Sequence, residues 1–310
     1  MEPPPAIISV FLGEPLTRML EAIAESHETS PAERKKLLTG VKSLPLLTLD
    51  DSDRNRTSPF AFTGNKFEFR MVGSSQGIGL VNAVINAIVA DTLRSYAEEL
   101  ETAQDKHAAV YDIVRRVFHE HGRIIFNGNN YSQEWTAEAE RRGLPNISCM
   151  VDAVDAFIAP KNVEMFARTK VFTPGECHSR YEILTEHYSK TIRIDAATML
   201  EMVDRGILPS AVEFLGKVAR SNYYNMGSGM TSNASVRLQS RLVAATDAVG
   251  ERSERLRTKL NTISHEDARA YHALCTGEME RLRAAADELE TLVPADRWPF
   301  PAYAELLFGL

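Results

Sequence analysis

Two apolar stripes with helical spacing, both in the last third of the chain, constrain its fold more than any other sequence feature. An interval of three or four residues places side chains on one face of an α-helix. A short stretch separates the two stripes, and in it Ser264 and Asp267 can cap the second helix. We therefore predict a long antiparallel helical hairpin over residues 236–292. The first stripe consists of Leu238, Leu242, Ala245, Val249, Leu256, Leu260 and Ile263, and the second of Tyr271, Cys275, Met279, Leu282, Ala286 and Leu289.

Helical patterns also fill most of the middle of the chain. The helix that begins near Gly79 should continue in some form to about His121. A capping box, T-P-G-E, opens a long helix at Thr173, with a kink expected near Pro209 because proline cannot continue the hydrogen-bond ladder. Residues 225–233 are rich in Gly, Ser, Met and Asn and predict a mobile loop. The other predicted helices cover residues 16–25, 31–39, 78–100 and 131–142, and a capping box, S-P-A-E, opens the second of them at Ser30. The apolar stripe of the third consists of Val81, Val84, Ile85, Ile88 and Val89.

Strand signals are few and lie mainly near the N-terminus. Residues 6–12 are apolar and rich in β-branched side chains, which indicates a buried strand. A second strand is predicted over residues 66–70, and a short third one over residues 123–126 between two turn signals. Together these patterns predict an α+β protein that is mostly α, with few strands.

The segment from Lys66 to Arg70 alternates strictly between charged and aromatic residues. Successive side chains of a strand point to opposite faces, so Phe67 and Phe69 share one face while Lys66, Glu68 and Arg70 share the other. A carboxylate can bind a hard cation, and a guanidinium can bind a carboxylate through two parallel hydrogen bonds. This pattern favours a site for anions and a metal. The alternative is a salt bridge within an edge strand, and both can hold at once.

Composition excludes several functional classes. The chain has 310 residues, of which 44% are hydrophobic and 25% charged, a composition typical of soluble globular proteins. Its net charge of -7 argues against a nucleic-acid binder, since such proteins are usually basic. Its three cysteines have no zinc or disulfide spacing, and the N-terminus has no signal-peptide pattern. We also expect no apolar run that approaches the length of a membrane span. These features predict a cytoplasmic protein that binds neither nucleic acid nor membrane.

Beyond these patterns, the chain resembles glutamine synthetases, and most closely the C-terminal portion of the large type III form. The resemblance implies a catalytic domain of which residues 1–95 form the C-terminal part, with few antiparallel strands, followed by a helical domain over residues 96–310. The motifs that carry it are N-R-T-S-P-F-A-F-T-G-N-K-F-E-F-R at residues 55–70, G-S-S-Q at 73–76, I-I-F-N-G-N at 124–129, R-R-G-L-P-N at 141–146, H-S-R-Y-E-I-L at 178–184 and W-P-F-P at 298–301.

The resemblance also implies roles for individual residues. Glu68 would bind one of two divalent metals, Mg²⁺ or Mn²⁺, and Arg70 the carboxylate of the substrate glutamate. Arg56 would contact the phosphates of ATP and act in catalysis. Lys66 stands where many relatives have arginine, so it keeps the positive charge near the nucleotide but lacks the planar guanidinium group and its paired donors. Arg54 is a further candidate for ATP binding.

Glu2 corresponds by resemblance to a flap residue that closes over the site, although Pro3 follows it where alanine is usual. In the family, ATP phosphorylates glutamate and ammonia then attacks the γ-glutamyl phosphate, in an active site shared by neighbouring subunits of a ring. The implied partners are therefore ATP, glutamate, ammonia and further copies of the chain. The family's remaining metal ligands are expected upstream of Met1, so we predict little activity from this chain alone. Two alternatives are a helical assembly or regulatory module without catalysis and a related γ-glutamyl-amine ligase.

Overall fold

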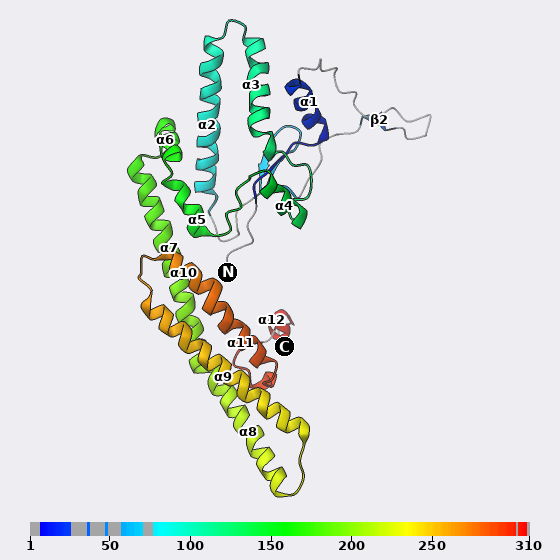
Figure 1. Cartoon of the computed structure of the whole chain (residues 1–310), viewed down its shortest axis with the longest axis vertical. Helices are drawn as coiled ribbons and strands as arrows, with labels where there is room; N and C mark the ends of the chain where they lie inside the picture. Colours follow the sequence, from blue (N-terminus) through cyan, green and yellow to red (C-terminus); the bar gives the residue numbers. More distant parts are fainter. Residues whose placement is uncertain are drawn as a thin grey trace. The chain divides into compact units, whose positions relative to one another are not determined.

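The computed structural model describes residues 7–25, 36–37, 47–48, 57–70, 77–301 and 303–308. The chain forms two compact units, one that ends at His178 and one that begins at Ser179. This division differs from the predicted boundary at residue 95, which falls inside helix α2 (Ile78–Thr102). The division falls inside helix α7 (Pro174–Met202), and the other helices each belong to one unit (Figure 1).

A three-stranded sheet lies in the first unit, in the order β1 (Val10–Phe11), β4 (Phe60–Phe62) and β5 (Phe67–Phe69). Strands β4 and β5 are antiparallel, as predicted, but β1 pairs with β4 in parallel. The predicted strand at residues 6–12 is shorter than expected, since β1 contains only Val10 and Phe11. Helix α1 (Glu14–Ala24) follows it, close to the predicted helix over residues 16–25.

Two local predictions near this sheet are wrong. The described part of the predicted helix 31–39 is strand β2 (Lys36–Leu37), which pairs antiparallel with β3 (Leu47–Thr48), so tertiary pairing overrides the capping signal. The predicted strand 123–126 is mainly a 3-10 turn, η1 (Gly122–Ile124). After this turn, Ile125 forms an isolated β-bridge with Val10.

The predicted helical stretch up to His121 is two helices rather than one. α2 ends at Thr102, and α3 (Lys106–His121) begins after Asp105, whose carboxylate accepts hydrogen bonds from the backbone N–H groups of His107 and Ala108 at 2.9 and 3.1 Å. The side-chain cap explains the break, because it satisfies two N–H groups that have no partner inside the new helix. Figure 1 shows α2 and α3 side by side, and the two helices contact each other.

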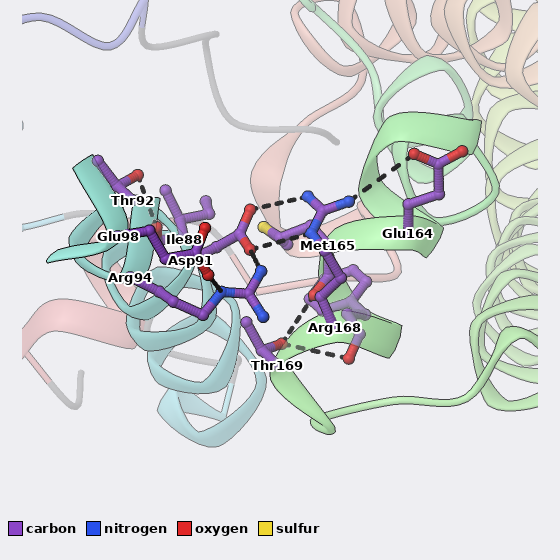
Figure 2. Close-up of polar contacts among 10 residues, drawn as sticks. Ile88, Asp91, Thr92, Arg94, Glu98, Glu164, Met165, Arg168 and Thr169 are labelled. Atoms are coloured by element: carbon purple, nitrogen blue, oxygen red, sulfur yellow. Dashed lines mark hydrogen bonds and ion pairs between the residues drawn. The ribbon is translucent and has the colours of Figure 1, made fainter. Parts of the chain in front are cut away.

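Helix α2 is held to helix α6 (Pro160–Thr169) by charge and by apolar packing. Figure 2 shows Asp91 of α2 between the guanidinium groups of Arg94 and Arg168. Arg168 donates to both carboxylate oxygens of Asp91, at 3.2 and 2.9 Å, and this pairing holds the pKa of Asp91 below its ordinary value. Nearby, Ala87 packs in a buried cluster with Met165, Phe166, Phe172 and Cys177.

The apolar stripe predicted for α2 is only partly buried. Val84 packs against the cluster around Ala87, whereas Ile88 and Val89 are about half exposed. Among the described residues, α2 is the one helix that is long and apolar enough to cross a membrane, by length and composition alone. Core helices of soluble proteins pass the same test, so a single helix of this kind is weak evidence for a membrane span. The expectation that no apolar run reaches that length is therefore wrong for this helix.

A second core of the first unit lies beneath α4 (Gln133–Arg141), which confirms the predicted helix over 131–142. The Trp135 side chain is buried, stacks on Phe126 with ring centroids 4.1 Å apart and donates to the backbone oxygen of Ile7 at 3.4 Å. Glu138 and Arg142 close this core at the surface, with a nitrogen–oxygen distance of 2.5 Å. The short helices α5 (Met150–Ala153) and η2 (Val154–Phe157) then lead to α6.

Helix α7 (Pro174–Met202) begins with the predicted capping box. The Thr173 hydroxyl accepts from the Glu176 N–H at 3.3 Å, and the Glu176 carboxylate accepts from the Thr173 N–H at 2.7 Å. A π-helical turn, η3 (Val203–Ile207), interrupts the helix directly before Pro209, where a kink is predicted. Proline removes one ladder donor and its ring displaces a carbonyl, which accounts for the wider turn.

The second unit contains the predicted helical hairpin. Helix α9 (Asn233–Thr262) packs along both α8 (Leu208–Gly227) and α11 (Glu280–Glu290), as Figure 1 shows. Helix α10 (Ala268–Leu274) is capped by Asp267 and joined to α11 by a π-helical turn, η4 (Cys275–Met279), that the sequence did not predict. The predicted loop 225–233 is shorter, because α8 continues to Gly227. The chain ends with η5 (Ala295–Arg297) and α12 (Tyr303–Phe308).

Candidate functional site

The candidate site is built on the hairpin formed by β4 and β5. Gly64, in the turn between the two strands, has a φ of 95°, which glycine adopts without strain. The Thr63 N–H donates to the backbone oxygen of Lys66 at 2.9 Å, and the Arg70 N–H donates to the backbone oxygen of Pro59 at 2.9 Å. The T-G-N turn thus sets the register in which Glu68 lies opposite Ala61.

Lys66, Glu68 and Arg70 lie on one face of the hairpin, as the alternation predicts. One oxygen of Glu68, Oε2, accepts hydrogen bonds from Nε and Nη2 of Arg70 at 3.2 and 2.8 Å. The other oxygen, Oε1, lies 3.5 Å from Nζ of Lys66. The predicted strand salt bridge is therefore present, and the trio combines two cations with one carboxylate.

The pKa of Glu68 is held below its ordinary value of 4.5 mainly by the hydrogen bond from Arg70. The charges of Arg70 and Lys66 act in the same direction, while burial acts in the opposite one. The Glu68 side chain is 37% exposed, so solvent screens these interactions in part. Glu68 is consequently ionised at neutral pH and stays paired with both cations.

Phenylalanine side chains form the opposite face of the hairpin. Phe60 stacks on Phe67 with centroids 5.3 Å apart and meets Phe69 edge to face at 5.9 Å. Phe62 also contacts Phe67 at 5.3 Å, yet Phe67 remains about half exposed. The aromatic face therefore stiffens the strand pair that carries the charged trio.

Asparagines of the loop after η1 hold the sheet in place. The Asn127 side-chain oxygen accepts from the N–H groups of Leu12 and Gly13 at 3.2 and 3.0 Å, and its amide donates to Thr17 at 3.0 Å. The Asn130 N–H donates to the backbone oxygen of Thr57 at 3.2 Å, just before β4. The sequence indicates only turns here, since the partners lie more than 70 residues away.

The described residues do not by themselves form a site for Mg²⁺ or Mn²⁺. Among them, no three His, Cys, Asp or Glu side chains lie together as a ligand set. Glu68 supplies a single carboxylate, and both of its oxygens already face cationic nitrogens. A Mg²⁺ ion takes six ligands in near-octahedral geometry, so one paired carboxylate is insufficient. The metal role of Glu68 remains a prediction.

The structure brings together half of the six residues proposed from the sequence. Lys66, Glu68 and Arg70 share one face of one hairpin. Glu2, Arg54 and Arg56 lie outside the described residues. The roles predicted for all six in binding and catalysis remain predictions.

Comparisons with known proteins point in the same direction as the motifs. Residues 109–225 match a family model described as the glutamine synthetase C-terminal domain. A type-3 glutamine synthetase of Dictyostelium discoideum is 33% identical over 323 residues, which cover 99% of this chain and 44% of that protein. A glutamine synthetase of Butyrivibrio fibrisolvens is 32% identical, over 100% of this chain and 45% of its own length. A glutamine synthetase of Bacteroides fragilis is 30% identical, over 99% of this chain and 45% of its own length. The chain thus spans less than half the length of these relatives.

Proposed function

The chain is a relative of the type III glutamine synthetases and matches their C-terminal portion, and we propose that it supplies substrate-binding residues of a glutamate–ammonia ligase. The proposed reaction joins ammonia to glutamate at the expense of ATP, through γ-glutamyl phosphate. Three relatives named glutamine synthetase match at least 99% of the chain, which supports the proposal. ATP, glutamate and ammonia are the substrates that follow from it.

One observation carries the assignment: Lys66, Glu68 and Arg70 lie together on one face of the β4–β5 hairpin. The reaction brings two anions together, ATP and glutamate, and opposing positive charge makes their approach less costly. We assign Arg70 to the substrate carboxylate and Lys66 to the nucleotide. Glu68 orients Arg70, because two donors on one oxygen restrict the guanidinium to one plane.

The remaining assignments extend the proposal beyond the described residues. We propose that Arg54 and Arg56 bind ATP phosphates and that Glu2 acts on a flap over the site. Mg²⁺ or Mn²⁺ would offset charge on the transferred phosphoryl group. Glu68 would then be one ligand, completed by groups beyond those described. A homo-oligomeric assembly and a cytoplasmic location belong to the same proposal.

We further propose that this chain alone has little ligase activity, since it spans less than half of its relatives' length. The assay measures γ-glutamyl transfer and phosphate release by the purified chain with Mg²⁺ or Mn²⁺. Turnover at a rate comparable to a full-length relative would refute this part of the proposal.

Binding tests the assignment of Arg70 directly. Isothermal titration of the chain with L-glutamate should give an affinity that falls about tenfold or more in Arg70→Gln, because a charge-assisted hydrogen-bond pair is lost. Arg18→Gln is the matched control, since Arg18 pairs with Glu14 on the exposed side of α1. Absence of glutamate binding, or equal affinity in wild type and Arg70→Gln, would contradict the assignment.

A second candidate function, assembly without catalysis, is favoured by exposed apolar side chains on α2 and α3. Ile88, Val89 and Leu93 of α2 and Val110 of α3 are each between two fifths and two thirds exposed. Surfaces of this kind favour association with other chains. A chain that binds neither glutamate nor ATP but forms a stable oligomer on size exclusion would support this function. A related γ-glutamyl-amine ligase is a further alternative, and the amine used in turnover assays distinguishes it.

A further inference from the structure

An apolar cavity of about 250 Å³ lies within the second unit, between the end of α7 and the start of α11. One wall consists of Met199 and Met202 of α7 together with the π-helical turn η3. The π-helical turn η4 and α11 form the other wall. The volume is that of about eight water molecules, at roughly 30 Å³ each. Side chains on both walls are therefore within reach of one small ligand.

Sulfur-bearing side chains are concentrated around this cavity. Four of the ten described residues that line it are methionine or cysteine, namely Met199, Met202, Cys275 and Met279. In the whole chain these two types account for only 13 of 310 residues, ten methionines and three cysteines. Methionine commonly fills gaps in apolar cores. An excess of this size at one cavity favours a role for the sulfur atoms themselves.

The four side chains form two pairs, one on each wall of the cavity. Met199 and Met202 are three residues apart in α7, an interval that places both on one helix face. Cys275 and Met279 are four residues apart within η4, whose wide turn brings them to the same side of the helix. Turns of this kind occur frequently at functional sites. Because methionine has three rotatable side-chain bonds, the sulfur atoms of both pairs can approach one point.

The cavity is shielded from water and still reachable from solvent. Met279 is 8% exposed, whereas Met202 is 39% exposed. Met199 and Cys275 are half-buried, and Cys275 is in no disulfide. A small ion can therefore enter from the side of Met202 and meet sulfur ligands in surroundings that contain little water.

The charge balance of the cavity favours a monovalent ion. Glu280 and Arg283 contribute one charge of each sign to its lining, and Arg283 also pairs with Asp287 at 2.6 Å. A thiolate at Cys275 adds one negative charge, while thioether groups are neutral. An ion of charge +1 would give a neutral site. A divalent ion would leave a positive charge in apolar surroundings, which costs free energy.

From these observations we infer that the cavity binds a soft monovalent metal ion of the class of Cu(I). Thiolate and thioether sulfur are the protein ligands that select Cu(I). Binding breaks the S–H bond of Cys275, releases its proton to solvent and forms a metal–sulfur bond, and the oxidation state of the metal does not change. The methionines complete the coordination without added charge. The inference does not depend on the proposed ligase site, since the cavity lies after Ser179 and the β4–β5 hairpin lies in the first unit.

The experiment titrates the purified full chain with Ag(I), which shares the charge and the ligand preference of Cu(I) and is stable in air. Cu(I) itself is then titrated under nitrogen against a coloured chelator. One equivalent of either ion should bind saturably, and a pH indicator should record about one proton released per ion. Zn²⁺ should bind at least about tenfold more weakly. Arg70→Gln should leave Ag(I) binding unchanged, which separates this site from the ligase proposal.

Variants of the cavity decide where the ion binds. Cys275→Ala should weaken Ag(I) binding about a hundredfold or more. Met202→Leu and Met279→Leu should each weaken it about tenfold, because leucine keeps the apolar volume and removes the sulfur. Met226→Leu is the matched control, since Met226 is 65% exposed on α8 and does not line the cavity.

Met202 is partly exposed, so its variant remains informative if Cys275→Ala fails to fold. Four results would each overturn the proposal: no saturable binding of Ag(I), equal affinity for Zn²⁺, unchanged affinity in Cys275→Ala, or equal affinities in Met202→Leu and Met226→Leu.

Discussion

Arg70 directs two donors, Nε and Nη2, at one oxygen of Glu68, at distances of 3.2 and 2.8 Å. The second oxygen of Glu68 is left to Lys66 at 3.5 Å. An anion that binds at this face must therefore compete with Glu68 for both cations. The hairpin holds the three side chains in register, so this competition is a property of the strand itself.

The first prediction concerns Glu68→Gln. Removal of the carboxylate charge should increase the affinity of the chain for inorganic tripolyphosphate, in the absence of metal ions, by about threefold to tenfold, because both cations lose a competitor. Isothermal titration at low ionic strength measures the change. Glu14→Gln is the control, since Glu14 pairs with Arg18 on exposed α1. Equal or weaker binding by Glu68→Gln would show that these cations do not receive anions.

The second prediction concerns pH and Glu138. Hydrogen bonds from Arg141 and then Arg142 lower the pKa of Glu138 from 4.5 to about 2. A lowered folded-state pKa stabilises the fold above the ordinary pKa, and this stabilisation is lost as pH falls from about 4.5 toward 2.

Wild type should therefore exceed Glu138→Gln in free energy of unfolding at pH 6, and the difference should shrink as the pH approaches 2. Urea denaturation at a series of pH values measures it, with Glu140→Gln on the exposed side of α4 as control. A difference that is constant with pH would contradict the pairing.

The third prediction compares two neighbouring residues of α9. Leu242 is 0% exposed and Val243 is 41% exposed. Leu242→Ala should lower the free energy of unfolding by about 2–5 kcal/mol, since it leaves a cavity between packed helices. Val243→Ala should change it by less than about 1 kcal/mol. Chemical denaturation followed by circular dichroism tests both, and similar losses in the two variants would argue against the predicted face of α9.

The fourth prediction compares two glycines. A Cβ atom at Gly128 would lie 2.5 Å from the Phe126 ring, which is stacked on buried Trp135 and cannot move freely. Gly128→Ala should therefore lower the free energy of unfolding by about 1–3 kcal/mol. Gly216→Ala, inside α8, should raise the free energy of unfolding by about 0.5–1 kcal/mol, because the added Cβ would meet no atom within 4 Å beyond its chain neighbours and the backbone of its own helix. Thermal and urea unfolding of both variants measure these changes, and a stabilised Gly128→Ala would refute the packing of this core.

Local rules predicted the features whose partners are close in sequence. The capping box of Thr173 and Glu176 involves residues three apart, and the structure confirms it. The shared face of Lys66, Glu68 and Arg70 follows from the period of two along a strand. The hairpin of α9 and α11 follows from the apolar stripes, since helical spacing requires no knowledge of the partner.

Predictions failed where the deciding partner is distant or where several local signals compete. The capping signal at Ser30 favoured a helix, yet Lys36 and Leu37 pair with a strand about ten residues later. The apolar run after Gly79 concealed the break at Asp105, because the residues on both sides of it favour helix. The π-helical turn at Cys275–Met279 had no signal in the spacing.

The sequence by itself determined the long helical segments of the second half of the chain, the capped start of α7 and which charged residues lie on one strand face, because these features depend on neighbours within about one turn. Only the tertiary structure decided that Asn127 anchors β1, that Asp91 links α2 to α6, and that Arg193 of α7 contacts His265. The physical reason is that these contacts join segments 72 to 115 residues apart, and no local spacing encodes which distant groups will meet when the chain folds.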